Sequence, residues 1–175
     1  RLYHFDSTRP GAVKDIRQHR GMMANLLQRS SIAISNRGVG GRPAETNWQG
    51  SLPPRFIEAA AAGAVLLGVA PDLPGMRTHF QWTDAHLPMA FDEPEAGAIV
   101  GHLLDQTERM AIASRRNIAQ CLRRHDHVHR LEVMLAEAGI APGPLALARK
   151  ARLDALAAVH ESAPVGTRTS DHRAP

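Results

Sequence analysis

Apolar and polar positions along the first 70 residues alternate between helical and strand-like spacing. Residues 14–31 carry apolar side chains three and four positions apart, which predicts an amphipathic helix. In the stretch SIAIS at 31–35, two isoleucines alternate with small residues, and this pattern predicts a short strand. A second helix is expected over residues 54–62, because prolines open it and a glycine follows it. The continuously apolar AVLLG at 64–68 then predicts a strand buried on both faces of a parallel sheet.

The second half of the chain is expected to be mainly helical. Residues 71–93 are rich in loop-forming residues, with one more short strand expected near LPMAF at 87–91. Apolar periodicity predicts three further helices, over 95–104, over 107–138 with a bend allowed, and over 142–159.

The order strand, helix, strand is the unit of an α/β domain. The sequence therefore predicts a Rossmann-like domain with a parallel sheet flanked by helices and with long C-terminal helices. We expect residues 1–159 to form this domain. Residues 160–175 are small, polar and proline-bearing, so we expect them to be a disordered tail.

Composition is that of one globular domain in a reducing compartment. The 175 residues are 43% hydrophobic, which is enough to bury one core. The lone Cys121 excludes an internal disulfide, no apolar run approaches the ~18 residues that a membrane span needs, and no signal-peptide pattern is found. A soluble, cytoplasmic domain is expected. Because the first residue is Arg1, we expect either a piece of a longer protein or a processed product.

The charge balance leaves a nucleic-acid partner as a distant alternative. Twenty-one Lys+Arg against 17 Asp+Glu give a net charge of +4 and a pI near 10.2. The basic residues alternate with acids along helical stretches, however, and only 4% of residues are aromatic, so stacking platforms for single strands are scarce. No nucleic-acid partner is therefore predicted.

Two charges, Arg55 and Glu58, stand in the otherwise apolar helix PPRFIEAAAAG at 53–63. They are three positions apart and share a face, while Phe56 and Gly63 fall on the side that packs. The helix dipole disfavours a cation in the first turn by roughly 0.3 to 1 kcal/mol. An anionic ligand at this helix start would make that placement useful. The alternative is a solvent-exposed ion pair worth a few tenths of a kcal/mol.

Two loops hold further candidate residues. RGVGGRP, beginning at Arg37, fails the dinucleotide fingerprint because Pro43 stands where the third glycine belongs. An Arg-flanked loop after a strand is nevertheless where open α/β sheets bind ligands, the alternative being a mobile connection. Asp84 follows Trp82 in a loop, where it would either line a cleft or cap a turn.

A metal site and a catalytic nucleophile are not predicted. In HDHVH, His125 and His129 would share a face of one continuous helix, but Asp126 replaces the glutamate of the zinc-protease pattern and no third ligand is evident. The alternative is a helix surface with one histidine packed against the sheet. No G-x-S-x-G occurs, and Cys121 lies among apolar neighbours, so it is expected to be a small core residue.

Three stretches carry a resemblance to a known family: PPRFIEAAAAGAVLLGVAPD, HFQWTDAHLP and RRHDHVHR. From about Met22 to Ala158 the chain resembles the C-terminal half of bacterial group 1 glycosyltransferases, in the spore-maturation-like and exopolysaccharide subgroup. The resemblance implies the two-domain GT-B fold, whose C-terminal domain holds a nucleotide-sugar donor. By this resemblance Glu58 would bond the ribose hydroxyls and Arg55 would contact the diphosphate.

The resemblance implies transfer of a sugar from a nucleotide-activated donor to a saccharide or other acceptor, in polysaccharide biosynthesis. No metal or other cofactor is expected, the partner would be an N-terminal GT-B domain, and a peripheral association with a membrane stays open. The last helix would then expose apolar surface that the partner domain covers. The expected donor-binding residues are Glu58, Arg55, Phe56, Gly63, Arg37 and Asp84.

Two departures from the family pattern limit this prediction. Many retaining members have a glutamate eight positions before the one that Glu58 matches, but Gly50 stands there and Glu45 is out of register. The choice between retention and inversion is therefore open, and the catalytic residues are not predicted. The second departure is length, because a complete GT-B enzyme has an N-terminal acceptor domain that we do not expect in these 175 residues. A non-catalytic nucleotide- or anion-binding module is therefore the alternative function.

Overall fold

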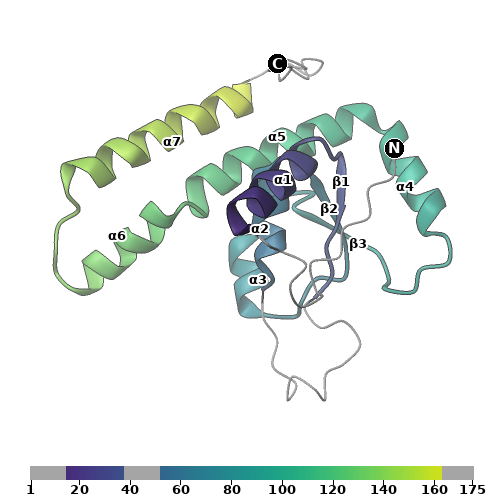
Figure 1. The fold of residues 1–175 in the computed structure, drawn as a ribbon, viewed down its shortest axis with the longest axis horizontal. Helices are drawn as coiled ribbons and strands as arrows, with labels where there is room; N and C mark the ends of the chain where they lie inside the picture. The colour runs from purple at the N-terminus through teal and green to yellow at the C-terminus, as the bar shows by residue number, and fades with distance from the viewer. Residues whose placement is uncertain (1–14, 38–51, 163–175) are drawn as a thin grey trace.

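The computed structural model describes residues 15–37 and 52–162. Its helices and strands follow one another in an alternating order and then continue as helices only (Figure 1). They are α1 (Ile16–Gln28), β1 (Ile32–Ile34), α2 (Pro54–Ala61), β2 (Val65–Gly68), α3 (Pro74–His79), β3 (His86–Pro88), α4 (Ala96–Asp105), α5 (Thr107–Arg124), α6 (His127–Glu137) and α7 (Pro144–Ser162).

The described strands form a three-stranded parallel sheet in the order β1-β2-β3. In its register Leu66 lies between Ala33 on one side and His86 on the other. All residues of β2 are buried, as its unbroken apolar run predicts for a central strand. The α/β class with a parallel sheet, flanking helices and long C-terminal helices is thus confirmed.

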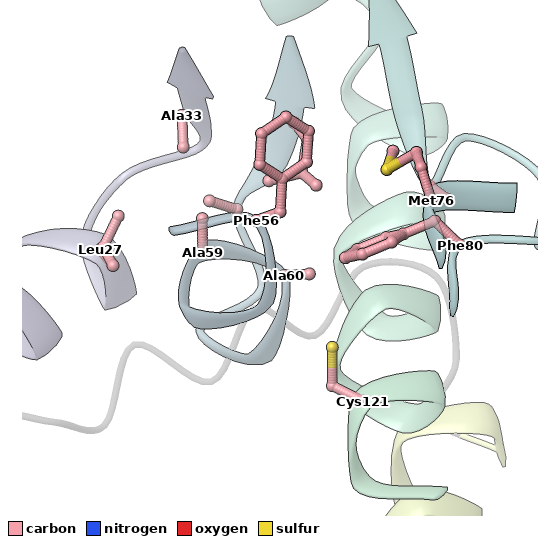
Figure 2. Close-up of a cluster of buried hydrophobic side chains, with 11 residues drawn as sticks. Leu27, Ala33, Phe56, Ala59, Ala60, Met76, Phe80 and Cys121 are labelled. Carbon is pink, nitrogen blue, oxygen red and sulfur yellow. The ribbon is translucent and has the colours of Figure 1, made fainter. Parts of the chain in front are cut away.

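Helices cover both faces of the sheet. One core cluster joins α1, α2 and α3 to the face that carries Leu66, and Figure 2 shows Phe56 and Ala59 of α2 between Leu27 of α1 and Phe80. The opposite face carries Val65 and Leu67, which pack against α4 and the first half of α5. Because Cys121, near the end of α5, belongs to the first cluster, α5 contributes to both cores.

A buried amide ties α5 to the start of the strands. The Asn117 side chain is fully buried, and its Nδ2 donates to the carbonyl of Ala64, 3.0 Å away. Its Oδ1 accepts from the indole Nε1 of Trp82 at 2.7 Å. Because Ala64 precedes β2 and Trp82 precedes β3, this one side chain joins the amino ends of two strands to the helix.

Several elements differ from the sequence prediction. α3 was expected to be loop, and β3 begins one residue before the predicted strand and ends three residues before its end. The helix expected over 107–138 is two helices, because Asp126 caps α6 by accepting a hydrogen bond from the Val128 amide at 3.0 Å. α7 continues through Ser162, past the expected end at residue 159, while most of the predicted tail lies outside the described residues.

The last two helices form a hairpin that extends from the sheet, with α7 packed along α5 (Figure 1). Large apolar side chains are exposed on both helices, as predicted for the last one; they are Leu131, Val133, Met134, Leu145, Leu147, Leu156 and Val159. Within the described ranges no helix is both long enough and apolar enough to cross a membrane.

Candidate functional site

The first turn of α2 lies at the edge of the sheet where the parallel strands end. α2 connects the end of β1 to the start of β2, so it runs antiparallel to both strands. Its N-terminus therefore faces the carboxyl edge of the sheet, where ligands bind in open α/β folds. Arg37 follows β1 at the same edge, is exposed, and donates its backbone amide to the Val69 carbonyl at 2.7 Å.

A groove of about 580 Å³ runs between α1 and α2. Its size suits a small-molecule ligand, since such pockets span ≈ 300–1,000 Å³. Both charged residues predicted on α2, Arg55 and Glu58, line it. The other lining residues come from both helices and the end of α2; they are Ile16, His19, Arg20, Met23, Ala24, Leu27, Gln28, Ala61 and Ala62.

Arg55 and Glu58 are both exposed, and the described part of the chain shows no ion pair between them. The alternative of a surface ion pair is therefore not what the structure forms. Both side chains remain available to a ligand in the groove.

Phe56 holds the first turn of α2 in the core instead of lining the groove. Its side chain is fully buried and stacks on His86 with ring centroids 5.6 Å apart. Its backbone amide is also occupied, because it donates to the Pro53 carbonyl at 3.0 Å. Phe56 therefore anchors the turn that carries Arg55, and its amide is not free to meet an anion.

Gly63 ends α2, as its place after the helix predicts. Its φ is +85°, and the Ala64 amide donates back to the Ala59 carbonyl at 3.0 Å, which is the Schellman arrangement. A Cβ at this position would meet Ile118 Cδ1 and Ser114 Oγ at 2.9 Å. The glycine thus permits both the turn and the close approach of α5, and it does not line the groove.

Asp84 lies at the opposite edge of the sheet from the α2 N-terminus, since it precedes β3. Its carboxylate accepts from Arg109 Nη2 at 2.8 Å and from Arg109 Nε at 3.2 Å. The hydrogen bond from Arg109 holds the pKa of Asp84 below its ordinary value. With φ of 59°, Asp84 occupies a turn, so the structure favours the turn alternative and does not bring this residue together with Arg55 and Glu58.

The two histidines of HDHVH do not share a helical face. His125 ends α5, is buried, and stacks on Phe80 with ring centroids 5.4 Å apart, while its Nε2 lies 3.1 Å from the His79 carbonyl. His129 lies on α6 and its Nε2 is 2.9 Å from the Leu122 carbonyl. The helix breaks between them at Asp126, so the expected pairing on one helix is wrong, and the Nε2 atom of each ring is already hydrogen-bonded to a backbone carbonyl.

Cys121 is a core residue, as its apolar neighbours predict. Burial raises the pKa of its thiol to about 12, so the nucleophilic thiolate is not formed near neutral pH. Among the residues that the structure describes, no three of His, Cys, Asp and Glu gather into a group suited to a metal ion.

The residues with which α1 lines the groove were not predicted from the sequence. Arg20, Met23, Ala24 and Leu27 follow one another at helical spacing, so the arginine continues the apolar stripe with which α1 packs. A charged residue at one end of such an apolar stripe is the sequence feature that could have indicated this wall of the groove. The Gly-rich loop after Arg37, with Glu45 and Gly50, lies outside the described residues.

The family model described as "Glycosyl transferase-like" matches residues 10–136. This range is more than half of the chain. The chain belongs to the glycosyl transferase-like family. In this glycosyl transferase-like chain the matched range includes both walls of the groove, whereas α7 lies beyond it. Neither a curated protein nor a solved structure gives a significant match.

Proposed function

We propose that this chain is the donor-binding half of a GT-B glycosyltransferase and that its nucleotide-sugar donor binds in the groove between α1 and α2. The observation that carries the proposal is that Arg55 and Glu58 line one groove whose Arg55 end faces the carboxyl edge of a parallel sheet in a glycosyl transferase-like domain. The spore-maturation-like and exopolysaccharide subgroup is part of this proposal, as are polysaccharide biosynthesis and a cytoplasmic site of action.

Each of the two side chains has a chemical task in the transfer. Glu58 accepts hydrogen bonds from the ribose hydroxyls, and Arg55 pairs with the diphosphate. In the reaction an acceptor hydroxyl oxygen bonds to the anomeric carbon, the bond from that carbon to the diphosphate oxygen breaks, and the hydroxyl proton passes to a catalytic base. The departing nucleoside diphosphate gains negative charge, which the guanidinium of Arg55 stabilises without a metal ion.

The groove leaves the acceptor and the catalytic base to a second domain. We propose that an N-terminal GT-B domain supplies both and packs against the exposed apolar side chains of α6 and α7. Five of them, Val133, Met134, Leu145, Leu147 and Val159, are each more than half exposed. Covering such surface is favourable by roughly 25 cal/mol per Å².

Calorimetric titration with UDP, GDP and TDP tests the donor site. Wild-type protein should bind one of them with micromolar to low-millimolar affinity. Glu58→Ala and Arg55→Ala should each weaken that binding roughly 10- to 150-fold, the range of a lost hydrogen bond to a charged group. Glu137→Ala and Arg152→Ala, exposed residues outside the groove, are the matched controls and should bind like wild type.

Circular dichroism must show that every variant is folded. Absence of binding to all three nucleotides by folded wild-type protein would remove the donor site. Binding that both variants weaken, without sugar transfer after an N-terminal domain is supplied, would favour the non-catalytic nucleotide-binding module instead.

A further inference from the structure

The two helices that wall the groove run in the same direction. α1 ends shortly before β1 and α2 ends shortly before β2, with residues 29–31 and 62–64 as the connections. Because β1 and β2 are parallel neighbours, both helix C-termini lie near the amino edge of the sheet. Figure 2 shows Leu27, near the end of α1, beside Ala59 of α2.

This arrangement places Arg20 and Arg55 in the same half of the groove. Leu27 lies beside Ala59; Arg20 stands seven positions before Leu27, and Arg55 stands four positions before Ala59. At a rise of about 1.5 Å per residue both arginines therefore come from opposite walls in the half of the groove near the helix N-termini, with Arg20 about one turn farther out than Arg55. That half faces the carboxyl edge of the sheet.

Neither arginine has a charge partner in the described ranges. Both are exposed, and Arg20 and Arg55 form no hydrogen bond or ion pair there through their side chains. Other arginines of the fold are paired, among them Arg109 with Asp84 and Arg149 with Asp126. Two like charges directed into one groove repel one another, and a bound anion with two charged groups removes that repulsion.

The lining residues of α2 follow the chemical order of a nucleotide. Glu58 lies one turn beyond Arg55, and Ala61 and Ala62 follow it, facing Leu27 and Gln28 of α1, while Ile16 lies one turn outside Arg20. Along α2 the groove thus offers a cation, then a hydrogen-bond acceptor, then a mainly apolar end that also carries the Gln28 amide. A nucleoside diphosphate presents its diphosphate, ribose and base in that order.

We propose that Arg20 is a second diphosphate-binding residue, opposite Arg55, and that the pair makes the groove selective for nucleoside diphosphates over monophosphates and nucleosides. The inference rests on the proposed function and adds a residue from α1 to it. A guanidinium from each wall provides bidentate donors to two phosphate groups, which one arginine cannot provide for both.

The test compares Arg20→Ala with Arg17→Ala, an exposed arginine of the same helix that does not line the groove. Each variant and wild type are titrated at constant ionic strength with the preferred nucleoside diphosphate, its monophosphate, its nucleoside and inorganic pyrophosphate. Arg20→Ala should lose roughly 10- to 150-fold in affinity for the diphosphate and for pyrophosphate. Affinity for the nucleoside should stay within twofold of wild type, and Arg17→Ala should leave every affinity unchanged.

Three results overturn the inference in different ways. If Arg55→Ala and Glu58→Ala weaken diphosphate binding but Arg20→Ala does not, the donor site stands and Arg20 has no part in it. If Arg17→Ala and Arg20→Ala weaken binding equally, the effect is long-range charge and not contact. If wild type binds pyrophosphate with an affinity that Arg20→Ala lowers, but binds no nucleotide, the anion site stands. The proposed function then fails, together with the nucleotide selectivity.

Discussion

Asn117→Ala removes the side chain that joins α5 to the amino ends of two strands. The alanine can neither donate to the Ala64 carbonyl nor accept from the Trp82 indole. Both hydrogen bonds are lost at once. Because Ala64 is fully buried, water cannot replace the hydrogen bond to its carbonyl.

The expected cost follows from these two lost partners. An unsatisfied buried carbonyl costs about 1–3 kcal/mol. The indole N–H of Trp82, which is half-buried, adds about 1 kcal/mol because it recovers part of its hydration. The free energy of unfolding should therefore fall by roughly 2–4 kcal/mol, which corresponds to a drop in Tm of about 5–15 °C for a domain of this size.

Urea unfolding followed by circular dichroism measures this change. Asn25→Ala, at an exposed position of α1, is the control and should stay within about 0.5 kcal/mol of wild type. Trp82→Phe, a milder change than Trp82→Ala, removes the N–H together with part of the indole ring, so it should cost at least about 1 kcal/mol. The two sites are coupled by one hydrogen bond, so Trp82→Phe should cost less in the Asn117→Ala background. A stability for Asn117→Ala equal to that of Asn25→Ala, or strictly additive effects, would refute the reasoning.

Three further predictions concern stability. Gly63→Ala should cost about 2 kcal/mol in urea unfolding because of its φ of +85°, whereas Gly101→Ala, in open space on α4, should be neutral or stabilising; equal effects would contradict this. Burial lowers the pKa of His125 from 6.5 to about 4, so protonation of this histidine opposes folding. The free energy of unfolding should therefore fall by up to about 3 kcal/mol between pH 6.5 and pH 4. In His125→Gln the free energy of unfolding should depend less on pH over this range. The hydrogen bond from Arg149 lowers the pKa of Asp126 from 3.8 to about 2, so the stability that this ion pair contributes above about pH 4 is lost as the pH falls towards 2. Asp126→Asn should make acid unfolding, followed by circular dichroism, less steep. An unchanged acid-unfolding curve would argue against a contribution of the Arg149–Asp126 pair.

The elements predicted well are those whose signals are local. β2 is an unbroken apolar run between glycines, and α2 is bounded by prolines and by Gly63. α3 was missed because its six residues are too few for a period and include Gly75. The break between α5 and α6 depends on competition at Asp126, where a cap and an ion pair with α7 outweigh a continuous helix. That ion pair joins distant positions and leaves no local pattern.

The candidate site divides in the same way. The spacing of Arg55 and Glu58 on one helix face was visible in the sequence, because it needs only the helical period. Arg20 comes from another helix, and its place in the same groove as Arg55 depends on how α1 packs against α2. Likewise, Asp84 accepts its hydrogen bonds from Arg109 on α5, so this pairing depends on tertiary structure and could not be predicted from the local sequence.

The way α5 completes both cores fixes when the domain can fold during synthesis. One cluster needs Met110 and Ala113 in the first half of the helix and the other needs Cys121 near its end, so neither face of the sheet is closed before the ribosome has released the first half of α5, and both are closed only after its end. From Gly68 onward, about 50 residues must still be added, which takes roughly 3–10 s at ordinary rates of translation. During that interval β2 presents its apolar side chains to solvent or to a chaperone. Nascent chains stopped before residue 110 should therefore be cut readily by protease, and chains stopped well past α5 should resist it.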